Sequence, residues 1–212
     1  MTTKANTKSG FHALTARQTA YKNIKQGLDT LISFVALSVL WPLFLLLILL
    51  IKAEEGMRSP AFFTQERIGE GKRRFRLYKF RTMKLDTPHD MPTHLLENPE
   101  QYVTRIGRFL RRSSLDELPQ LLNILKGDMS LSGPRPALWN QDDLTQARED
   151  AGVHQLKPGL TGWAQIHGRD ELSIPEKVAL DAEYLRHFGF FIDVRCFFLS
   201  IGAVLGHKGV RA

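Results

Sequence analysis

Residues 30–51 read TLISFVALSVLWPLFLLLILLI, and this stretch sets how the whole chain is built. It carries no charged side chain, and only Thr30, Ser33, Ser38 and Pro42 interrupt its apolar residues. A helix of this length would extend roughly 33 Å, which is enough to cross a hydrocarbon core of about 30 Å. No small-residue cleavage site follows the stretch, so a removed signal peptide is not favoured. The sequence therefore predicts a chain that is held in a membrane.

The flanks of this stretch bear on whether it crosses the membrane. Positive residues favour the cytoplasmic side, and here they lie upstream (Lys4, Lys8, Arg17, Lys22, Lys25) as well as downstream (Lys52, Arg58, Arg67, Lys72, Arg73, Arg74, Arg76). A single crossing would place one basic flank on the wrong face. Pro42 has no N–H to donate to the carbonyl of Ser38, so a helix bent there could enter and leave on one side. A single-span anchor with a tolerated proline remains the alternative.

The rest of the chain has the composition of a small α+β domain that is mostly helical. We predict a tail at 1–20, a membrane helix at 21–54 bent near Pro42, and a catalytic domain at 55–212. Alternation and turn residues predict short strands at 61–65 and 73–82, joined by a turn at 69–71, with a surface loop at 87–99. Apolar periodicity predicts helices at 102–112, 121–125, 137–151, 175–187 and 191–205, and a short strand at 163–166. The last helix is apolar and aromatic enough to lie along the membrane surface.

The charge balance points to anionic partners. The 212 residues carry 29 Lys and Arg against 22 Asp and Glu, a formal charge of +7. Nucleic acid, an acidic lipid surface and phosphorylated substrates would all fit this balance. The single cysteine, Cys196, excludes a disulfide framework and a cysteine-rich metal site.

Residues 113–120 read SSLDELPQ, with two adjacent carboxylates at the start of a predicted helix. Two capping arrangements would explain them structurally. Ser114 and Glu117 have the spacing of a capping box. Alternatively, Asp116 is the N-cap residue, and Pro119 then lies at the third helical position, where its missing N–H costs nothing. Spacing alone therefore leaves a purely structural role open.

The same position also suits chemistry. A helix N-terminus together with Arg111 and Arg112 would keep Asp116 ionised and would attract a phosphate. An ionised carboxylate can attack phosphorus and form an acyl phosphate, which divides one transfer into two steps. A divalent cation and several arginines would relieve the repulsion between the carboxylate and a diphosphate. Asp116 is therefore a candidate nucleophile.

Further polar residues are candidate ligands of phosphate. Lys79 continues the apolar face of its predicted strand, so its ammonium must reach water or meet an anion. Arg135 lies between two prolines, which lowers the entropy cost of holding a phosphate or carboxylate. Gln165 and Arg169 follow a glycine-containing turn, where loop residues often bind ligands. A strand-end lysine, a structural salt bridge and surface polar residues are the respective alternatives.

Taken together, the motifs resemble a known family. In order along the chain they are FTQERIG at 63–69, YKFRTM at 78–83, SLDELPQL at 114–121 followed by Asn123 and KGDMS at 126–130, GPRP at 133–136, and KPGLTGWAQ at 157–165. This set resembles the bacterial sugar transferases, the monotopic phosphoglycosyl transferases, and in particular their small members. The resemblance extends over about residues 20–205.

The resemblance implies a reaction. Asp116 and Glu117 match the catalytic Asp-Glu dyad, in which the aspartate attacks the β-phosphate of a UDP-sugar, releases UMP and holds the sugar phosphate covalently. A polyprenyl phosphate, usually undecaprenyl phosphate, then accepts it in a ping-pong cycle that requires Mg²⁺, with the aspartate near the metal. The substrate-binding residues that we assign on this basis are Lys79, Arg81, Arg111, Arg135, Gln165 and Arg169.

The resemblance also implies a location and a pathway. The family's N-terminal helix is re-entrant and broken at a proline that Pro42 matches, although Trp41 stands where members often have serine. The enzyme would lie on the cytosolic face of the bacterial inner membrane, in contact with lipid, and would begin synthesis of a capsule, O-antigen, exopolysaccharide or glycoprotein glycan. PRPAL at 134–138 and HGRD at 167–170 point to a deoxy-N-acetylhexosamine donor. A homo-oligomer is left open.

Two alternatives compete with the transferase. A membrane-tethered basic module that binds nucleic acid or acidic lipid explains the charge and the apolar helix, but not an Asp-Glu pair followed by GPRP. A degenerate relative that acts as a scaffold is disfavoured by the intact pair. We therefore expect no nucleic-acid partner.

Overall fold

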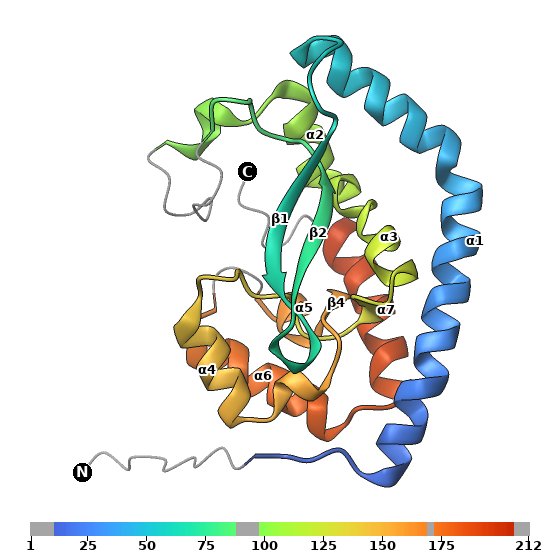
Figure 1. The fold of residues 1–212 in the computed structure, drawn as a ribbon, viewed down its shortest axis with the longest axis vertical. Helices are drawn as coiled ribbons and strands as arrows, with labels where there is room; N and C mark the ends of the chain where they lie inside the picture. The colour runs from blue at the N-terminus through green and yellow to red at the C-terminus, as the bar shows by residue number, and fades with distance from the viewer. Residues whose placement is uncertain (1–10, 88–97, 169–171, 206–212) are drawn as a thin grey trace.

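The computed structural model describes residues 11–87, 98–168 and 172–205, and it confirms a mostly helical α+β fold (Figure 1). The long helix α1 (Ala16–Glu55) runs along one side of the molecule. It begins before the predicted boundary at residue 21, because Thr15 caps it. The Thr15 hydroxyl accepts from Gln18 N (3.2 Å) and the Gln18 side chain accepts from Thr15 N (3.0 Å), which forms a capping box.

Helix α1 is continuous through Pro42, and Figure 1 shows it curving around the domain rather than reversing direction. Ser38 Oγ donates to Phe34 O (2.9 Å), a local bond that often accompanies helix bending. Among the described residues, α1 is the one helix long and apolar enough to cross a membrane. The helix was expected to be broken at Pro42. In the structure it is curved but continuous there.

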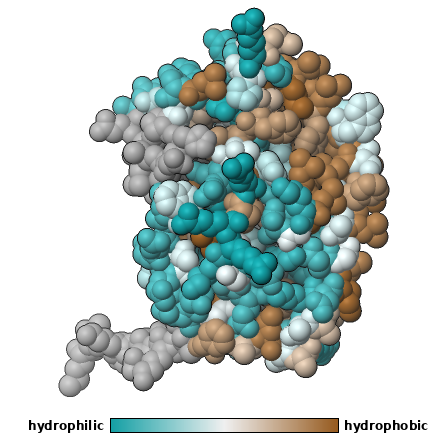
Figure 2. Space-filling model, in the orientation of Figure 1, coloured by the Kyte–Doolittle hydropathy of each residue, from teal (hydrophilic) through white to brown (hydrophobic). Residues whose placement is uncertain are grey.

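The two faces of α1 differ in polarity. Its inner face buries polar residues in the N-terminal half and Leu47 and Ile51 near the C-terminal end. Its outer face exposes large apolar side chains, namely Ile24, Leu28, Leu31, Ile32, Phe34, Val35, Val39, Trp41, Leu45, Leu46, Leu49 and Leu50. Figure 2 shows this apolar edge beside a hydrophilic front face.

The predicted pair of strands is confirmed. Strands β1 (Phe62–Ile68) and β2 (Arg74–Phe80) form an antiparallel hairpin closed by the 3₁₀ turn η1 (Glu70–Lys72). Phe80 packs with Leu47, Ile51 and Leu110 in a core cluster that joins the hairpin to the C-terminal end of α1. The hairpin thus places β2 beside the rest of the domain (Figure 1), with Lys79 next to the last residue of the strand.

The two helices predicted in the central segment are confirmed, whereas the two short strands that follow them were not predicted. Helix α2 (Arg105–Ser113), the 3₁₀ turn η4 (Leu115–Glu117) and helix α3 (Gln120–Leu125) are succeeded by strand β3 (Ser130–Ser132). Strand β4 (Gly159–Thr161) pairs with β3 in parallel. Gly127 adopts φ +81° after α3, as expected of a glycine that ends a helix.

The C-terminal part contains α4 (Asp142–Asp150), the 3₁₀ turn η5 (Val153–Gln155), α5 (Trp163–Ile166), α6 (Ile174–Arg186) and α7 (Phe190–Leu205). The predictions for α6 and α7 are confirmed. The helix predicted from residue 137 starts only at Asp142, because Ala137 and Leu138 pair with the end of β1 instead. The strand predicted at 163–166 is wrong, since Ile166 N donates to Gly162 O (3.2 Å) and closes a helical turn.

Some predicted segments cannot be compared with the structure. The loop predicted at 87–99 lies mostly outside the described residues, apart from its ends and the 3₁₀ turn η3 (Pro99–Tyr102) that follows. The first half of the predicted tail also lies outside them.

Candidate functional site

The two adjacent carboxylates lie on a tight turn between helices. Ser114 adopts the left-handed conformation (φ 56°), so the chain leaves α2 and enters η4 in a new direction. Neither capping arrangement is formed: η4 and α3 have no side-chain cap, and Pro119 is itself the N-cap residue of α3. The side chains of Asp116 and Glu117 therefore remain available for other contacts.

Those contacts are with cations from two distant segments. Lys79 Nζ on β2 lies 2.9 Å from Glu117 Oε1 and 3.9 Å from Asp116 Oδ2. Arg135 Nη2 lies 3.1 Å from the same Glu117 oxygen. Glu117 thus holds Lys79 and Arg135 together, while Asp116 sits beside Lys79 in a second, looser contact. Of the two outcomes expected for the Lys79 ammonium, water or an anion, the structure shows an anion, the carboxylate of Glu117.

Asn123 on α3 holds β2 in place. Its Oδ1 accepts from Tyr78 N (3.0 Å) and its Nδ2 donates to Arg76 O (2.7 Å), so one buried amide clamps the backbone on either side of Leu77. The open edge of a two-stranded hairpin needs such partners. Sequence reasoning quoted Asn123 only within a motif and did not assign it this role.

Arg111 lies near the dyad from the side of α2. Its Nε donates to Thr82 Oγ1 (3.0 Å), just beyond the end of β2. The close approach of α2 depends on Gly107, since a Cβ there would lie 2.0 Å from Thr82 O. Burial lowers the pKa of Arg111, and the charge of Asp116 counteracts this effect. Arg111 therefore belongs to the electrostatic surroundings of Asp116.

Residues 133–136 form a loop after β3, which we call the Arg135 loop, and three glycines allow it to lie against β4. A Cβ at Gly159 would lie 2.1 Å from Gly133 N, and one at Gly162 would lie 2.3 Å from Gly133 O. Gln165, which is buried, sits beside this contact and donates to Leu160 O (3.3 Å). Its Oε1 has no hydrogen-bond partner among the described residues and lies close to Gly162.

Two residues of the predicted set stand apart from this cluster. Arg81 Nε donates to Pro60 O (3.0 Å). Burial lowers the pKa of Arg81, and the charge of Glu55, the last residue of α1, opposes this effect. Arg169 lies outside the described residues. The structure therefore groups Asp116, Glu117, Lys79, Arg111 and Arg135, with Gln165 behind the Arg135 loop.

The two carboxyl groups have opposite pKa shifts. Burial raises the pKa of Asp116; Lys79 opposes the rise, the neighbouring Glu117 adds to it, and Arg111 and Arg135 also oppose it. Glu117 is buried too, but the charges of Lys79 and Arg135 and their hydrogen bonds outweigh this and lower its pKa. The expected cations lie near Asp116, but desolvation outweighs their effect, so its pKa is raised rather than lowered.

The donor set could hold a hard divalent cation with help from a substrate. Among the described residues, no group of three or more His, Cys, Asp or Glu side chains forms a ready metal cage. Mg²⁺ commonly binds through one or two carboxylates plus substrate phosphates and water. Asp116, whose charge is only loosely compensated by Lys79, fits that pattern.

Comparison with known sequences places this cluster in a family. A sequence model described as bacterial sugar transferase matches residues 20–207. The chain belongs to the bacterial sugar transferase family. The matched residues include the dyad, the cations around it and the whole of α1 except its first turn.

Several curated proteins are similar to this sugar transferase. "Uncharacterized sugar transferase EpsL" of Bacillus subtilis is 45% identical over 153 residues, covering 72% of this chain and 74% of that protein. "Exopolysaccharide production protein ExoY" of Rhizobium meliloti is 37% identical over 201 residues and 87% of each chain. The UDP-glucose:undecaprenyl-phosphate glucose-1-phosphate transferase of Xanthomonas campestris is 38% identical over 187 residues, 85% of this chain but 38% of that protein. The sugar transferase thus spans well under half of the Xanthomonas protein.

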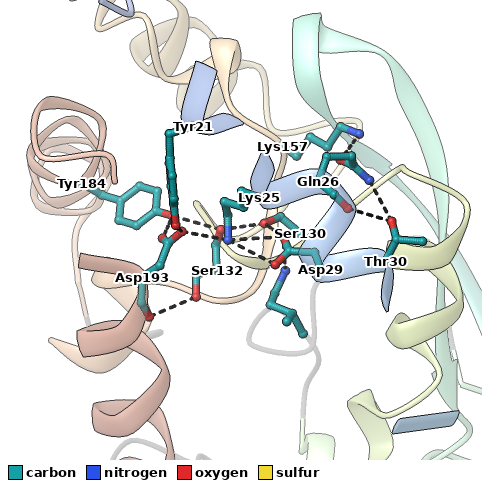
Figure 3. A network of polar contacts seen from close by, with 11 residues as sticks. Tyr21, Lys25, Gln26, Asp29, Thr30, Ser130, Ser132, Lys157, Tyr184 and Asp193 are labelled. Atoms are coloured by element: carbon teal, nitrogen blue, oxygen red, sulfur yellow. Dashed lines mark hydrogen bonds and ion pairs between the residues drawn. The ribbon is translucent and has the colours of Figure 1, made fainter. Parts of the chain in front are cut away.

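A buried polar network fastens α1 to the rest of the sugar transferase (Figure 3). Lys25 Nζ lies 2.9 Å from Asp193 Oδ2 on α7, and Tyr21 and Tyr184 both donate to the same carboxylate. One turn further along α1, Asp29 accepts from the Ser130 hydroxyl and from Leu131 N on β3. Sequence reasoning missed this network. Its only local signal is the pair of charged residues just before the apolar stretch.

Proposed function

We propose that this sugar transferase moves a sugar 1-phosphate from a UDP-sugar to a polyprenyl phosphate such as undecaprenyl phosphate, and so begins synthesis of a bacterial surface glycan. The observation that carries the proposal is the buried dyad of Asp116 and Glu117 between Lys79 and Arg135 in a member of this family. The Xanthomonas relative is named as a UDP-glucose:undecaprenyl-phosphate glucose-1-phosphate transferase, and this supports the two substrate classes.

Asp116 is the nucleophile in this proposal. Its carboxylate oxygen attacks the β-phosphorus, a new P–O bond forms, and the bond to the α-phosphate oxygen breaks, so that UMP departs with its electron pair. A phosphate oxygen of the polyprenyl phosphate then attacks the same phosphorus and releases the Asp116 carboxylate. Each half-reaction exchanges one P–O bond for another, so Asp116 is regenerated.

Glu117 and its cations prepare the site for this chemistry. Because Glu117 binds Lys79 and Arg135 through one oxygen, both cations are held near Asp116 before the substrate arrives. Preorganised charges of this kind stabilise a transferring phosphoryl group without reorganising during the reaction. Arg111 adds further positive charge in the surroundings of Asp116.

A Mg²⁺ ion completes the proposed site, with Asp116 as its protein ligand. When bound, it would supply positive charge that favours the ionised carboxylate and offsets the charge of the diphosphate. Because desolvation raises the pKa of Asp116, a bound cation would favour its ionised, nucleophilic form.

We place the enzyme on the cytosolic face of the inner membrane without a crossing. At the N-terminal end of α1, Gln18 Nε2 donates to Leu185 O (3.1 Å); near the other end, Ile51 packs with Phe80 and Leu110. Because both ends of α1 contact the same domain, a crossing would pull one of them away. The exposed apolar face of α1 and the exposed phenylalanines of α7 (Phe190, Phe191, Phe197, Phe198) supply the lipid-facing surface.

The donor sugar is the least constrained part of the proposal. The stretches at 134–138 and 167–170 favour a deoxy-N-acetylhexosamine, whereas the Xanthomonas relative is named for glucose. A panel of UDP-sugars incubated with the full chain and Mg²⁺, quenched during turnover and analysed by intact mass, would identify the donor from the mass added to Asp116.

The test of the nucleophile uses isosteric variants of the dyad. Asp116→Asn should release no UMP from any UDP-sugar and should show no covalent adduct, while Glu117→Gln should retain a reduced rate because it disturbs only the cations. Normal UMP release by Asp116→Asn, with the fold intact, would remove Asp116 from this role.

A further inference from the structure

Another buried ion pair contacts the Arg135 loop and involves residues not yet assigned a role. Arg148 on α4 and Asp181 on α6 are 4% and 1% exposed. Arg148 Nε and Nη2 both donate to Asp181 Oδ2, at 2.9 Å and 2.6 Å. The pair joins two helices that do not themselves carry a residue of the dyad.

The remaining nitrogen of the same guanidinium reaches the site. Arg148 Nη1 donates to the backbone carbonyl of Arg135 at 2.8 Å. Asp181 thus fixes the plane of the guanidinium, and the guanidinium fixes the Arg135 backbone. The planar fork of arginine suits this task, because its N–H groups diverge in fixed directions.

The carbonyl groups of the Arg135 loop provide further points of attachment. Pro134 and Pro136 on either side have no N–H to donate, so the loop is held mainly through its carbonyl groups. Arg67 Nη1 donates a hydrogen bond to the Pro136 carbonyl (3.1 Å), and Gly159 N donates one to the Pro134 carbonyl (2.9 Å). A small hollow lies against the loop, so packing from behind is incomplete.

We propose that Arg148 and Asp181 are positioning residues, which hold the Arg135 backbone so that its side chain meets Glu117 and the substrate phosphates. The inference rests on the proposed function and extends it to residues that do not touch the substrate. The competing explanation is that the pair only ties α4 to α6. A buried ion pair can often be replaced by apolar residues of similar size without loss of stability, which makes the two explanations separable.

The test is the double variant Arg148→Leu/Asp181→Leu, measured as UMP release by the full chain in detergent with Mg²⁺. Its thermal midpoint should stay near that of the wild type, because no unpaired charge is left buried. Its kcat/KM should fall by about 10- to 100-fold, the cost of a misplaced catalytic group. A stable double variant with wild-type kcat/KM would overturn the proposal.

A double-mutant cycle asks whether the effect passes through Arg135. In an Arg135→Met background, replacement of the pair should change kcat/KM by less than about twofold, because the group that it positions is absent. An equal loss in both backgrounds would mean that the pair acts elsewhere, which contradicts the inference. Lys72→Met/Glu149→Gln, which removes an exposed ion pair of α4, is the matched control and should leave kcat/KM unchanged.

Two further measurements keep the outcome decisive. If the double variant does not fold, Arg148→Lys is measured in its place. The lysine ammonium can pair with Asp181 but lacks the second arm of the guanidinium that reaches the Arg135 carbonyl, so kcat/KM should still fall. Full activity of Arg148→Lys would overturn the proposal. Amide hydrogen exchange of residues 131–138 requires no turnover. It should become faster in the double variant, and unchanged exchange would refute the inference. A wild-type chain that releases no UMP would instead refute the proposed function.

Discussion

At the scale of single residues, the dyad combines two carboxyl groups whose pKa values are shifted in opposite directions by folding. Glu117 gains two cations as close partners, whereas Asp116 is buried with only a distant contact to Lys79. A group whose pKa folding raises is stabilising only in its protonated form, so its stabilisation is lost as pH rises through the folded pKa. A group whose pKa folding lowers adds stability above its unfolded pKa and loses it as pH falls through the folded pKa.

The isosteric amides should therefore shift stability in opposite directions. At pH 7, Asp116→Asn should raise the thermal midpoint, because it removes a desolvated charge. Glu117→Gln should lower stability by about 2 kcal/mol, less than for a fully buried pair because Arg135 is partly exposed. The Asp116→Asn difference should shrink as pH falls from the raised folded pKa of Asp116 to its unfolded value of about 4, whereas the Glu117→Gln difference should shrink only as pH falls below the unfolded pKa of Glu117, about 4.3. Thermal melts of the variants from pH 3 to pH 8 would check this; equal shifts at pH 7 would contradict it.

At the scale of secondary-structure elements, the site depends on backbones that approach without intervening side chains. Strand β3 pairs in parallel with β4, and just beyond the end of β3 the backbone of Gly133 lies against Gly159. This contact sets where the Arg135 loop begins. A glycine at such a position is required by space, whatever its φ angle.

Replacement of Gly159 by Ala should therefore be costly. The new Cβ would lie 2.1 Å from Gly133 N and 2.3 Å from Thr161 O, so the strands must separate. We expect a loss of at least about 2 kcal/mol in stability, together with reduced UMP release. Gly27→Ala is the control: nothing lies within 4 Å of its Cβ, and alanine should stabilise α1 slightly. The thermal midpoints of the two variants would show whether the Gly133–Gly159 contact requires glycine. A wild-type midpoint for Gly159→Ala would refute this role of the contact.

At the scale of the whole molecule, α1 is both the membrane segment and a structural part of the domain. Its N-terminal half is fixed by the network around Asp193 (Figure 3), and its C-terminal end packs in the core cluster with the hairpin. The same helix exposes a continuous apolar face. In the proposed placement, this arrangement would hold the site at the membrane surface, where a lipid phosphate and a soluble nucleotide sugar can meet.

Both ends of α1 should then be reachable from one side of the membrane. Single cysteines at Thr19 and Met57, which are exposed positions near the two ends, should react with an impermeant maleimide in inverted vesicles and not in intact spheroplasts. The native Cys196 gives little background, because it is buried and burial, with Asp193, raises its pKa to about 12. Labelling of the two positions from opposite sides would establish a single crossing instead.

Local patterns were sufficient for much of this protein. The uncharged stretch at 30–51, the hairpin, helices α6 and α7 and the Asp-Glu motif could all be predicted, because composition, alternation and motif order are properties of neighbouring residues. The capping box at Thr15 and Gln18 also has a local signature, so the true start of α1 could have been found.

Contacts between distant segments decided the rest. Ala137 and Leu138 lie beside β1 rather than in α4, and residues 163–166 form a helical turn, because tertiary partners override local preference. No spacing rule indicates that Lys79, Arg135 and Glu117 share one oxygen atom, or that Arg148 reaches the Arg135 carbonyl. The sequence by itself determined the membrane helix, the fold class and the chemical identity of the dyad. Only the tertiary structure decided which carboxyl group is neutralised by cations and which is left desolvated, since charge and burial depend on groups brought together through space.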